Sequence, residues 1–288
     1  MPRARYIPEL LRTHAEDLAF VWGWRRHALN SPAHTQRDYA DLSERLEAHV
    51  QGLLCAPPQD LLERLGPALA TADADESFAA AYALLRTREP GATKAVVVAF
   101  SGAGGQALQG LREALSSAAP ALFADEMSSA LQHANPATAA AAAAVLASHR
   151  LLPSASVRLG QLLEDDDAAT VALAWRAAML ADHNPRDELP SRPYWLALSH
   201  KDPAVRDAGW AAVTWAGQAT AKPHAAQLCG RRRHRGPALA CDAERGRRPA
   251  AGATWCAGAG ERRRTLRPAG APRPPRRPER PRALDAGG

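Results

Sequence analysis

Three short segments of this 288-residue chain resemble one another and recur at a regular interval. They are Asn135-Pro136-Ala137, Asp167-Ala168-Ala169 and Asp202-Pro203-Ala204, whose first residues are 32 and 35 positions apart. An Asp or Asn oxygen can accept a hydrogen bond from a free backbone N–H at a helix start, and Pro suits the first helical position. Each segment therefore predicts the start of a helix. A second helix and a turn fit between successive starts, and this two-helix period is typical of a helical solenoid.

The sequence before the repeats predicts a helical hairpin over residues 1–56. Its first helix is expected over 8–29, ended by Asn30-Ser31-Pro32, and its second over 36–54. Apolar residues recur at three- and four-residue steps, which defines one face of each helix. In the first helix this face contains Leu10, Leu11, His14, Leu18, Val21, Trp22 and Leu29, and in the second Tyr39, Leu42, Leu46, Val50 and Leu53.

Residues 57–229 are expected to form the repeats. The predicted helices are 59–70, 75–87, 92–101, 105–117, 121–132, 136–149, 154–163, 168–182, 191–199 and 203–216. Alanine is unusually frequent, with 66 residues, whereas the chain has only four Phe and four Tyr. Only the run Ala95–Phe100 could form a strand, and a lone strand has no partner, so a buried helix is expected there. The composition and pattern predict an all-α fold.

Part of the last repeat resembles a known motif. The segment from Lys201 to Ala212 is similar to the D-P-x-V-R-x-x-A-A core of HEAT repeats. The resemblance implies that Asp202 caps the helix, that Val205 contacts the core and that Arg206 bonds neighbouring caps. Residues 14–22 and 38–49 resemble a proteobacterial HEAT-repeat family of unassigned function, whose genes are sometimes found near type VI secretion genes. This resemblance covers about residues 1–229 and implies a HEAT-like α-solenoid.

The composition changes abruptly after Cys229. Residues 1–229 carry 20 basic and 25 acidic side chains, whereas residues 230–288 carry 16 Arg and five acidic side chains, a net charge of +11. Residues 230–288 also contain few large apolar residues, too few to bury the surface that folding requires, so a disordered tail is predicted. The favoured explanation is a shifted reading frame, because out-of-frame GC-rich codons give Arg, Pro, Gly and Ala. The alternative is a genuine basic arm that binds nucleic acid through clusters such as 231–235 and 262–264. Resequencing from about codon 210 past the stop distinguishes the two.

Several classes of protein are unlike this sequence. No apolar run approaches the length of about 20 residues that spans a bilayer, and the charged N-terminus does not resemble a signal peptide. The four cysteines are scattered and include no CxxC pair. The sequence therefore predicts a cytoplasmic protein that has no membrane contact, metal or cofactor, and it does not indicate the oligomeric state.

The residues that could carry chemistry have simpler structural interpretations. His14 and His49 lie on apolar faces and are expected to be packed and hydrogen-bonded. The segment 101–105 is rich in Gly but lacks the Lys of a phosphate-binding loop, so a turn is expected. The acidic run 164–167 precedes a helix, where it favours capping. Cys55 has no activating neighbour in sequence. No catalytic constellation is predicted.

One surface hint remains in the first helix. Phe20, Trp24 and His27 lie off the main apolar face and are flanked by Arg25 and Arg26. Aromatic residues beside Arg are typical of binding sites, although the same residues could pack against the start of the solenoid. We expect a non-catalytic scaffold or adaptor that binds another protein. Two alternatives are a nucleic-acid-binding repeat protein and a HEAT-type lyase, the latter supported by the expected fold alone.

Overall fold

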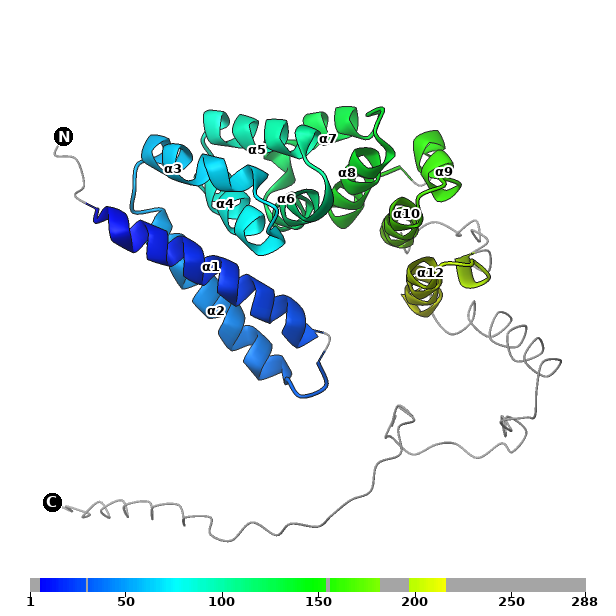
Figure 1. Cartoon of the computed structure of the whole chain (residues 1–288), viewed down its shortest axis with the longest axis horizontal. Coiled ribbons are helices and arrows are strands. Elements are labelled where there is room, and N and C mark those ends of the chain that lie inside the picture. Colours follow the sequence, from blue (N-terminus) through cyan, green and yellow to red (C-terminus); the bar gives the residue numbers. More distant parts are fainter. Residues whose placement is uncertain (1–5, 30, 154–155, 182–196, 216–288) are drawn as a thin grey trace, which may run out of the picture. The chain divides into compact units, whose positions relative to one another are not determined.

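A computed structural model describes residues 6–29, 31–153, 156–181 and 197–215 (Figure 1). The described residues form helices and contain no strand, which confirms the predicted all-α fold. The α-helices are α1 (Pro8–Leu29), α2 (Gln36–Leu53), α3 (Pro58–Leu65), α4 (Ala74–Arg86), α5 (Pro90–Gly102), α6 (Gly105–Ser117), α7 (Ala124–Ala130), α8 (Pro136–Ser148), α9 (Val157–Leu163), α10 (Ala168–Ala181) and α12 (Pro203–Trp215). Residues 191–196 and 230–288, with the predictions made for them, lie outside the described residues.

Helices α1 and α2 pack against each other as the predicted hairpin (Figure 1). Helix α2 begins with a capping box, in which Thr35 and Asp38 exchange hydrogen bonds between side chain and backbone. Most of the predicted apolar faces are buried, but Leu10 and Leu29 are 52% and 64% exposed, contrary to the expectation for α1. Leu10 is turned about 100° from its buried neighbour Leu11, and Leu29 is the last residue of the helix.

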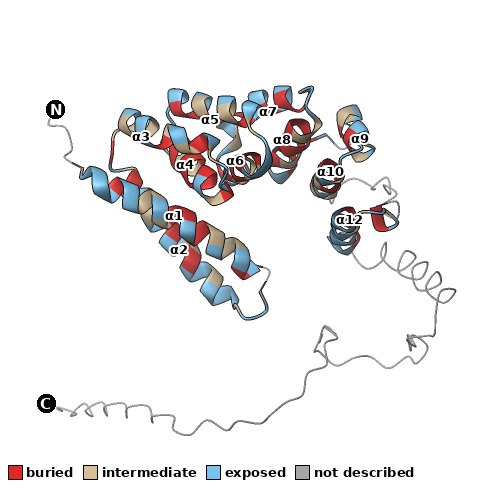
Figure 2. Cartoon of the chain, viewed as in Figure 1, coloured by how far each residue is buried: buried red, intermediate tan, exposed pale blue. Residues whose placement is uncertain are grey.

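The remaining helices form two layers. Helices α4, α6, α8, α10 and α12 contact one another in that order, and α3, α5, α7 and α9 pack on the helices of this first layer. Helix α1 contacts α4, so the hairpin covers the first end of the stack. Each helix contacts near neighbours in the sequence, which is the contact pattern of a solenoid. Buried residues gather where the helices face one another (Figure 2).

Small residues allow the stacked helices to approach closely. Helix α8 is buried along most of its length, and Ala139 to Ala143 are at most 1% exposed. In α6, a Cβ atom on Gly110 would lie 2.2 Å from the carbonyl oxygen of Ala74 in α4. The close contact between α4 and α6 therefore requires glycine at this position.

The repeat anchors act as helix caps, as predicted. Asn135, Asp167 and Asp202 each accept a hydrogen bond from a backbone N–H in the first turn of their helix. Val205 is fully buried, as the HEAT resemblance implies. Arg206 instead donates to the carbonyl oxygens of residues 200 and 201, within its own preceding turn. No bond from Arg206 to a neighbouring cap occurs among the described residues.

Three predicted helices differ from the observed bounds by three or more residues at one end, for local reasons. The segment 59–70 forms α3 followed by a 3₁₀ helix (Gly66–Ala70), because Pro67 disfavours an α-helix through residue 66. The segment 121–132 begins with a 3₁₀ turn (Pro120–Leu122) and becomes α7 only at Ala124. Helix α9 starts at Val157, where Ser156 caps it. The run 95–100 is helical as expected, but only one of its faces is buried, because Val98 is 63% exposed.

Candidate functional site

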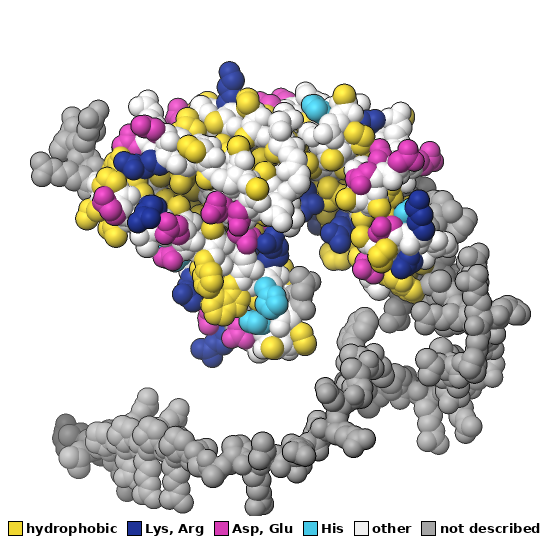
Figure 3. All heavy atoms as spheres, in the orientation of Figure 1, with side chains coloured by type: hydrophobic (Ala, Val, Ile, Leu, Met, Phe, Trp, Pro, Cys, Tyr) yellow, Lys and Arg dark blue, Asp and Glu magenta, His cyan; other side chains and the backbone are white. Residues whose placement is uncertain are grey.

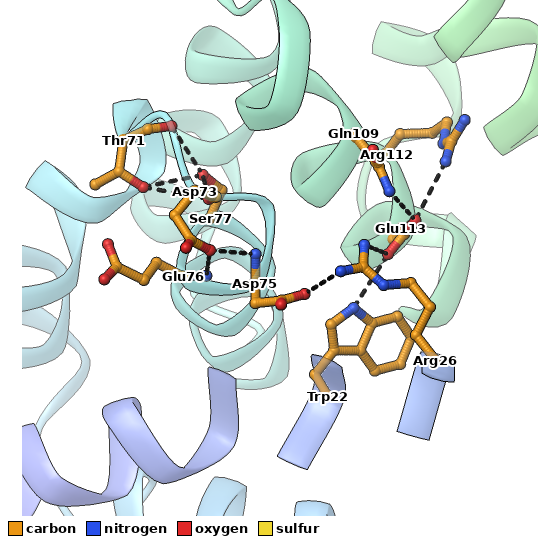
Figure 4. Close-up of polar contacts among 10 residues, drawn as sticks. All are labelled: Trp22, Arg26, Thr71, Asp73, Asp75, Glu76, Ser77, Gln109, Arg112 and Glu113. Carbon is orange, nitrogen blue, oxygen red and sulfur yellow. Dashed lines mark hydrogen bonds and ion pairs between the residues drawn. The ribbon is translucent and has the colours of Figure 1, made fainter. Parts of the chain in front are cut away.

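A polar network joins the hairpin to the repeats (Figure 4). The Trp22 ring stacks on Phe78 of α4, with centroids 3.6 Å apart, and its Nε1 donates to Glu113 of α6 over 3.1 Å. The Arg26 guanidinium lies 2.7 Å from an Asp75 oxygen and 3.6 Å from a Glu113 oxygen. One turn of α1 therefore contacts both α4 and α6.

The two carboxylates of this network, Asp75 and Glu113, form ion pairs and hydrogen bonds with neighbouring side chains. Glu113 also accepts hydrogen bonds from Gln109 and Arg112 (Figure 4). Burial raises the pKa of Asp75, an effect that the positive charge of Arg26 opposes. Burial has the opposite effect on a cation, and it lowers the pKa of the Arg112 guanidinium. Because these groups satisfy one another, the network is best described as a structural junction.

An exposed aromatic pair lies on another face of α1. Phe20 and Trp24 are 62% and 42% exposed, and their rings meet edge to face with centroids 5.7 Å apart. The Trp24 Nε1 donates to His34 over 3.3 Å, and the His34 ring also lies 6.2 Å from that of His27. Figure 3 shows hydrophobic and histidine side chains gathered on the hairpin. These residues therefore do not pack against the solenoid.

The two arginines of the predicted surface lie apart from this aromatic pair. Arg25 donates to Ser43 of α2 and lies over the Tyr39 ring, 4.4 Å from its centroid. Arg26 lies in the junction described above. Of the four residues proposed from the sequence, the structure brings Phe20 and Trp24 together at the surface and directs Arg25 and Arg26 into contacts within the chain.

A groove that was not predicted from the sequence lies on the adjacent side of α1. It has a volume of about 550 Å³ and is formed between α1, α3, the following 3₁₀ helix and α4. Its residues are Pro8, Leu11, Arg12, Ala15, Glu16, Ala19, Leu61, Arg64, Leu65, Ala68, Glu76, Ala79 and Ala80. Most are aliphatic, and the four charged residues come from three helices. A largely apolar pocket of this volume with a few polar groups is typical of a binding site.

The other candidate residues have the structural roles expected from the sequence. Nδ1 of His14 lies 3.2 Å from Nδ1 of His49, so the two rings share a hydrogen bond. In the Gly-rich segment 101–105, only residues 103 and 104 connect the two helices, because α5 ends at Gly102 and α6 begins at Gly105. Asp167 accepts from both the backbone and the hydroxyl of Thr170, and these bonds lower its pKa.

The described residues contain neither a cluster of metal-ligating side chains nor a membrane-spanning helix. No group of three or more His, Cys, Asp or Glu there is arranged to hold a metal ion. None of the helices that the structure describes is both long enough and apolar enough to cross a bilayer. The basic clusters at 231–235 and 262–264 lie outside the described ranges.

Comparisons with protein families, curated proteins and solved structures gave no significant match. The resemblance to HEAT repeats therefore stays a prediction.

Proposed function

We propose that this chain is a non-catalytic scaffold that binds another protein through the hairpin. The observation that carries this proposal is the solvent-exposed edge-to-face pair of Phe20 and Trp24. Two neighbouring exposed aromatic rings on a rigid helix are typical anchors of a protein interface. The extended surface of a helical stack is also suited to binding a partner.

The energetics of the aromatic pair support binding. Covering the exposed parts of both rings would bury on the order of 200 Å² of apolar surface, which corresponds to about 5 kcal/mol before the costs of association. The junction with α4 and α6 holds α1 in place, which limits the conformational entropy that binding would cost.

The resemblance to HEAT-repeat proteins extends the proposal. On that basis, the scaffold would be a cytoplasmic adaptor associated with a secretion system. The nucleic-acid alternative depends on residues 230–288, and the lyase alternative has no support in the described residues beyond the helical fold.

The proposal can be tested by quantitative affinity capture with the full chain. Replacing both Phe20 and Trp24 by Ala is expected to reduce capture of a specific partner at least about tenfold, as expected for interface anchors. The matched control is Val157→Ala, which changes a 78% exposed side chain on α9. Nuclease treatment before capture separates protein partners from nucleic acid. Equal capture by the double variant and the control would refute the proposal.

A further inference from the structure

We propose that the groove beside α1 binds a short amphipathic helix of a partner protein, with an acidic side chain near one end of its contact face and a basic side chain near the other. The inference rests on the proposed scaffold function and names the kind of partner that the hairpin takes. The groove and the aromatic pair are adjacent, because Glu16 lines the groove and Phe20 lies one turn further along α1.

The apolar part of the groove matches one face of a helix. Its α1 side extends from Pro8 to Ala19, which corresponds to about 16 Å or three helical turns. Leu61 and Leu65 line the opposite side, and Ala80 is 2% exposed between the helices. Small and aliphatic residues of this kind accept the aliphatic side chains of an amphipathic helix.

One end of the groove is basic. Arg64 lies near the start of α1, because its guanidinium is 6.0 Å from the centroid of the Tyr6 ring. Arg64 lines the groove, so an acidic side chain of a partner would meet its positive charge at this end.

The other end is acidic. Glu76 belongs to the first turn of α4, and that turn lies against Gly23, where an added Cβ would be 2.6 Å from Asp75. Arg12 and Glu16 also line the groove, but they lie 3.4 Å apart and pair with each other between its two ends, so Arg64 and Glu76 are the charges that mark the ends. A uniformly charged partner would therefore meet like charge at one end.

Three synthetic peptides test this charge pattern. All have the same Leu/Ala face. One carries Glu at one end and Lys at the other, one carries Lys at both ends, and one carries Glu at both ends. In fluorescence anisotropy with the full chain, the mixed peptide is expected to bind tightest, and each uniformly charged peptide about two- to fivefold more weakly. The variant Glu76→Lys should shift the preference to the peptide with Glu at both ends.

A blocked groove provides the control. Ala15→Phe fills the groove from a half-buried position and should weaken binding of the mixed peptide at least about tenfold, whereas Ala99→Phe on α5 should not change it. Circular dichroism checks that both variants are folded. The inference is overturned if no peptide binds, or if the order of the peptides is the same with Glu76→Lys. The scaffold proposal fails separately, in the Phe20/Trp24 capture experiment.

Discussion

The close contact of α6 with α4 predicts opposite effects for the same substitution at two helical glycines. A Cβ atom at Gly110 would lie 2.2 Å from the Ala74 carbonyl oxygen and 2.9 Å from the backbone nitrogen of Phe78. Both are backbone atoms of α4, so the two helices would have to move apart by more than 1 Å. At Gly160 in α9, an added Cβ would have no neighbour within 4 Å.

The expected magnitudes differ in sign. Gly→Ala within a helix gains about 1 kcal/mol of helix propensity, but overpacking typically costs up to about 3 kcal/mol and more where backbone cannot move. Gly110→Ala should therefore lower the free energy of unfolding by about 2 kcal/mol, which corresponds to a Tm decrease of about 4–8 °C. Gly160→Ala should raise Tm by about 1–4 °C.

Thermal unfolding of the full chain, followed by circular dichroism at 222 nm, measures both effects. Helical content before the transition should be similar in the two variants, which shows that each folds. The reasoning is refuted if Gly110→Ala is as stable as Gly160→Ala, because the close approach of α6 to α4 would then not require glycine.

Three further substitutions test individual contacts. Arg86 bonds Glu47 and lowers the pKa of this carboxyl to about 2, so the stabilisation from the pair is present above about pH 4.5 and lost towards pH 2. Glu47→Gln should remove about 1 kcal/mol or less of this acid-dependent stability, because the pair is partly exposed. Urea unfolding at pH 7 and at pH 3 measures the difference. Asp167→Ala should cost about 1 kcal/mol as a lost helix cap, whereas Asp166→Ala, at an exposed neighbour, should be nearly neutral in urea unfolding. Trp22→Phe keeps an aromatic ring on Phe78 but removes the hydrogen-bond donor to Glu113 of α6. The free energy of unfolding should fall by about 1 kcal/mol, and an unchanged Tm in thermal unfolding would contradict the role of that bond.

The sequence predicted the local structure well where short-range signals determine it. Asn135, Asp167 and Asp202 cap their helices as predicted, because a cap depends on residues within one turn. The sequence did not predict the groove, because its lining comes from three α-helices and a 3₁₀ helix and includes residues up to 72 positions apart, from Pro8 to Ala80.

The paired arginines show a second limit of sequence analysis. Arg25 and Arg26 are adjacent to Trp24 in sequence, yet their partners lie on α2, α4 and α6. Helical spacing indicates which side chains share a face of α1, but it does not identify the helix that covers each face. Which helix covers each face depends on how the hairpin packs against α4. The stacking of Trp22 on Phe78 fixes this packing, and the spacing of the two residues in the sequence does not predict it.

Helix α10 contributes to two hydrophobic clusters that share no buried residue. Ala174, Ala177 and Ala178 belong to the large cluster that extends back to α1, whereas Val171 and Trp175 belong to a smaller cluster with α12. We therefore expect the smaller cluster to open before the larger one. Amide hydrogen exchange should accordingly reveal an opening unit that includes α12, with protection rising from α10 towards α8. A perturbation at α12 would then unfold this unit locally and leave the packing of the hairpin unchanged.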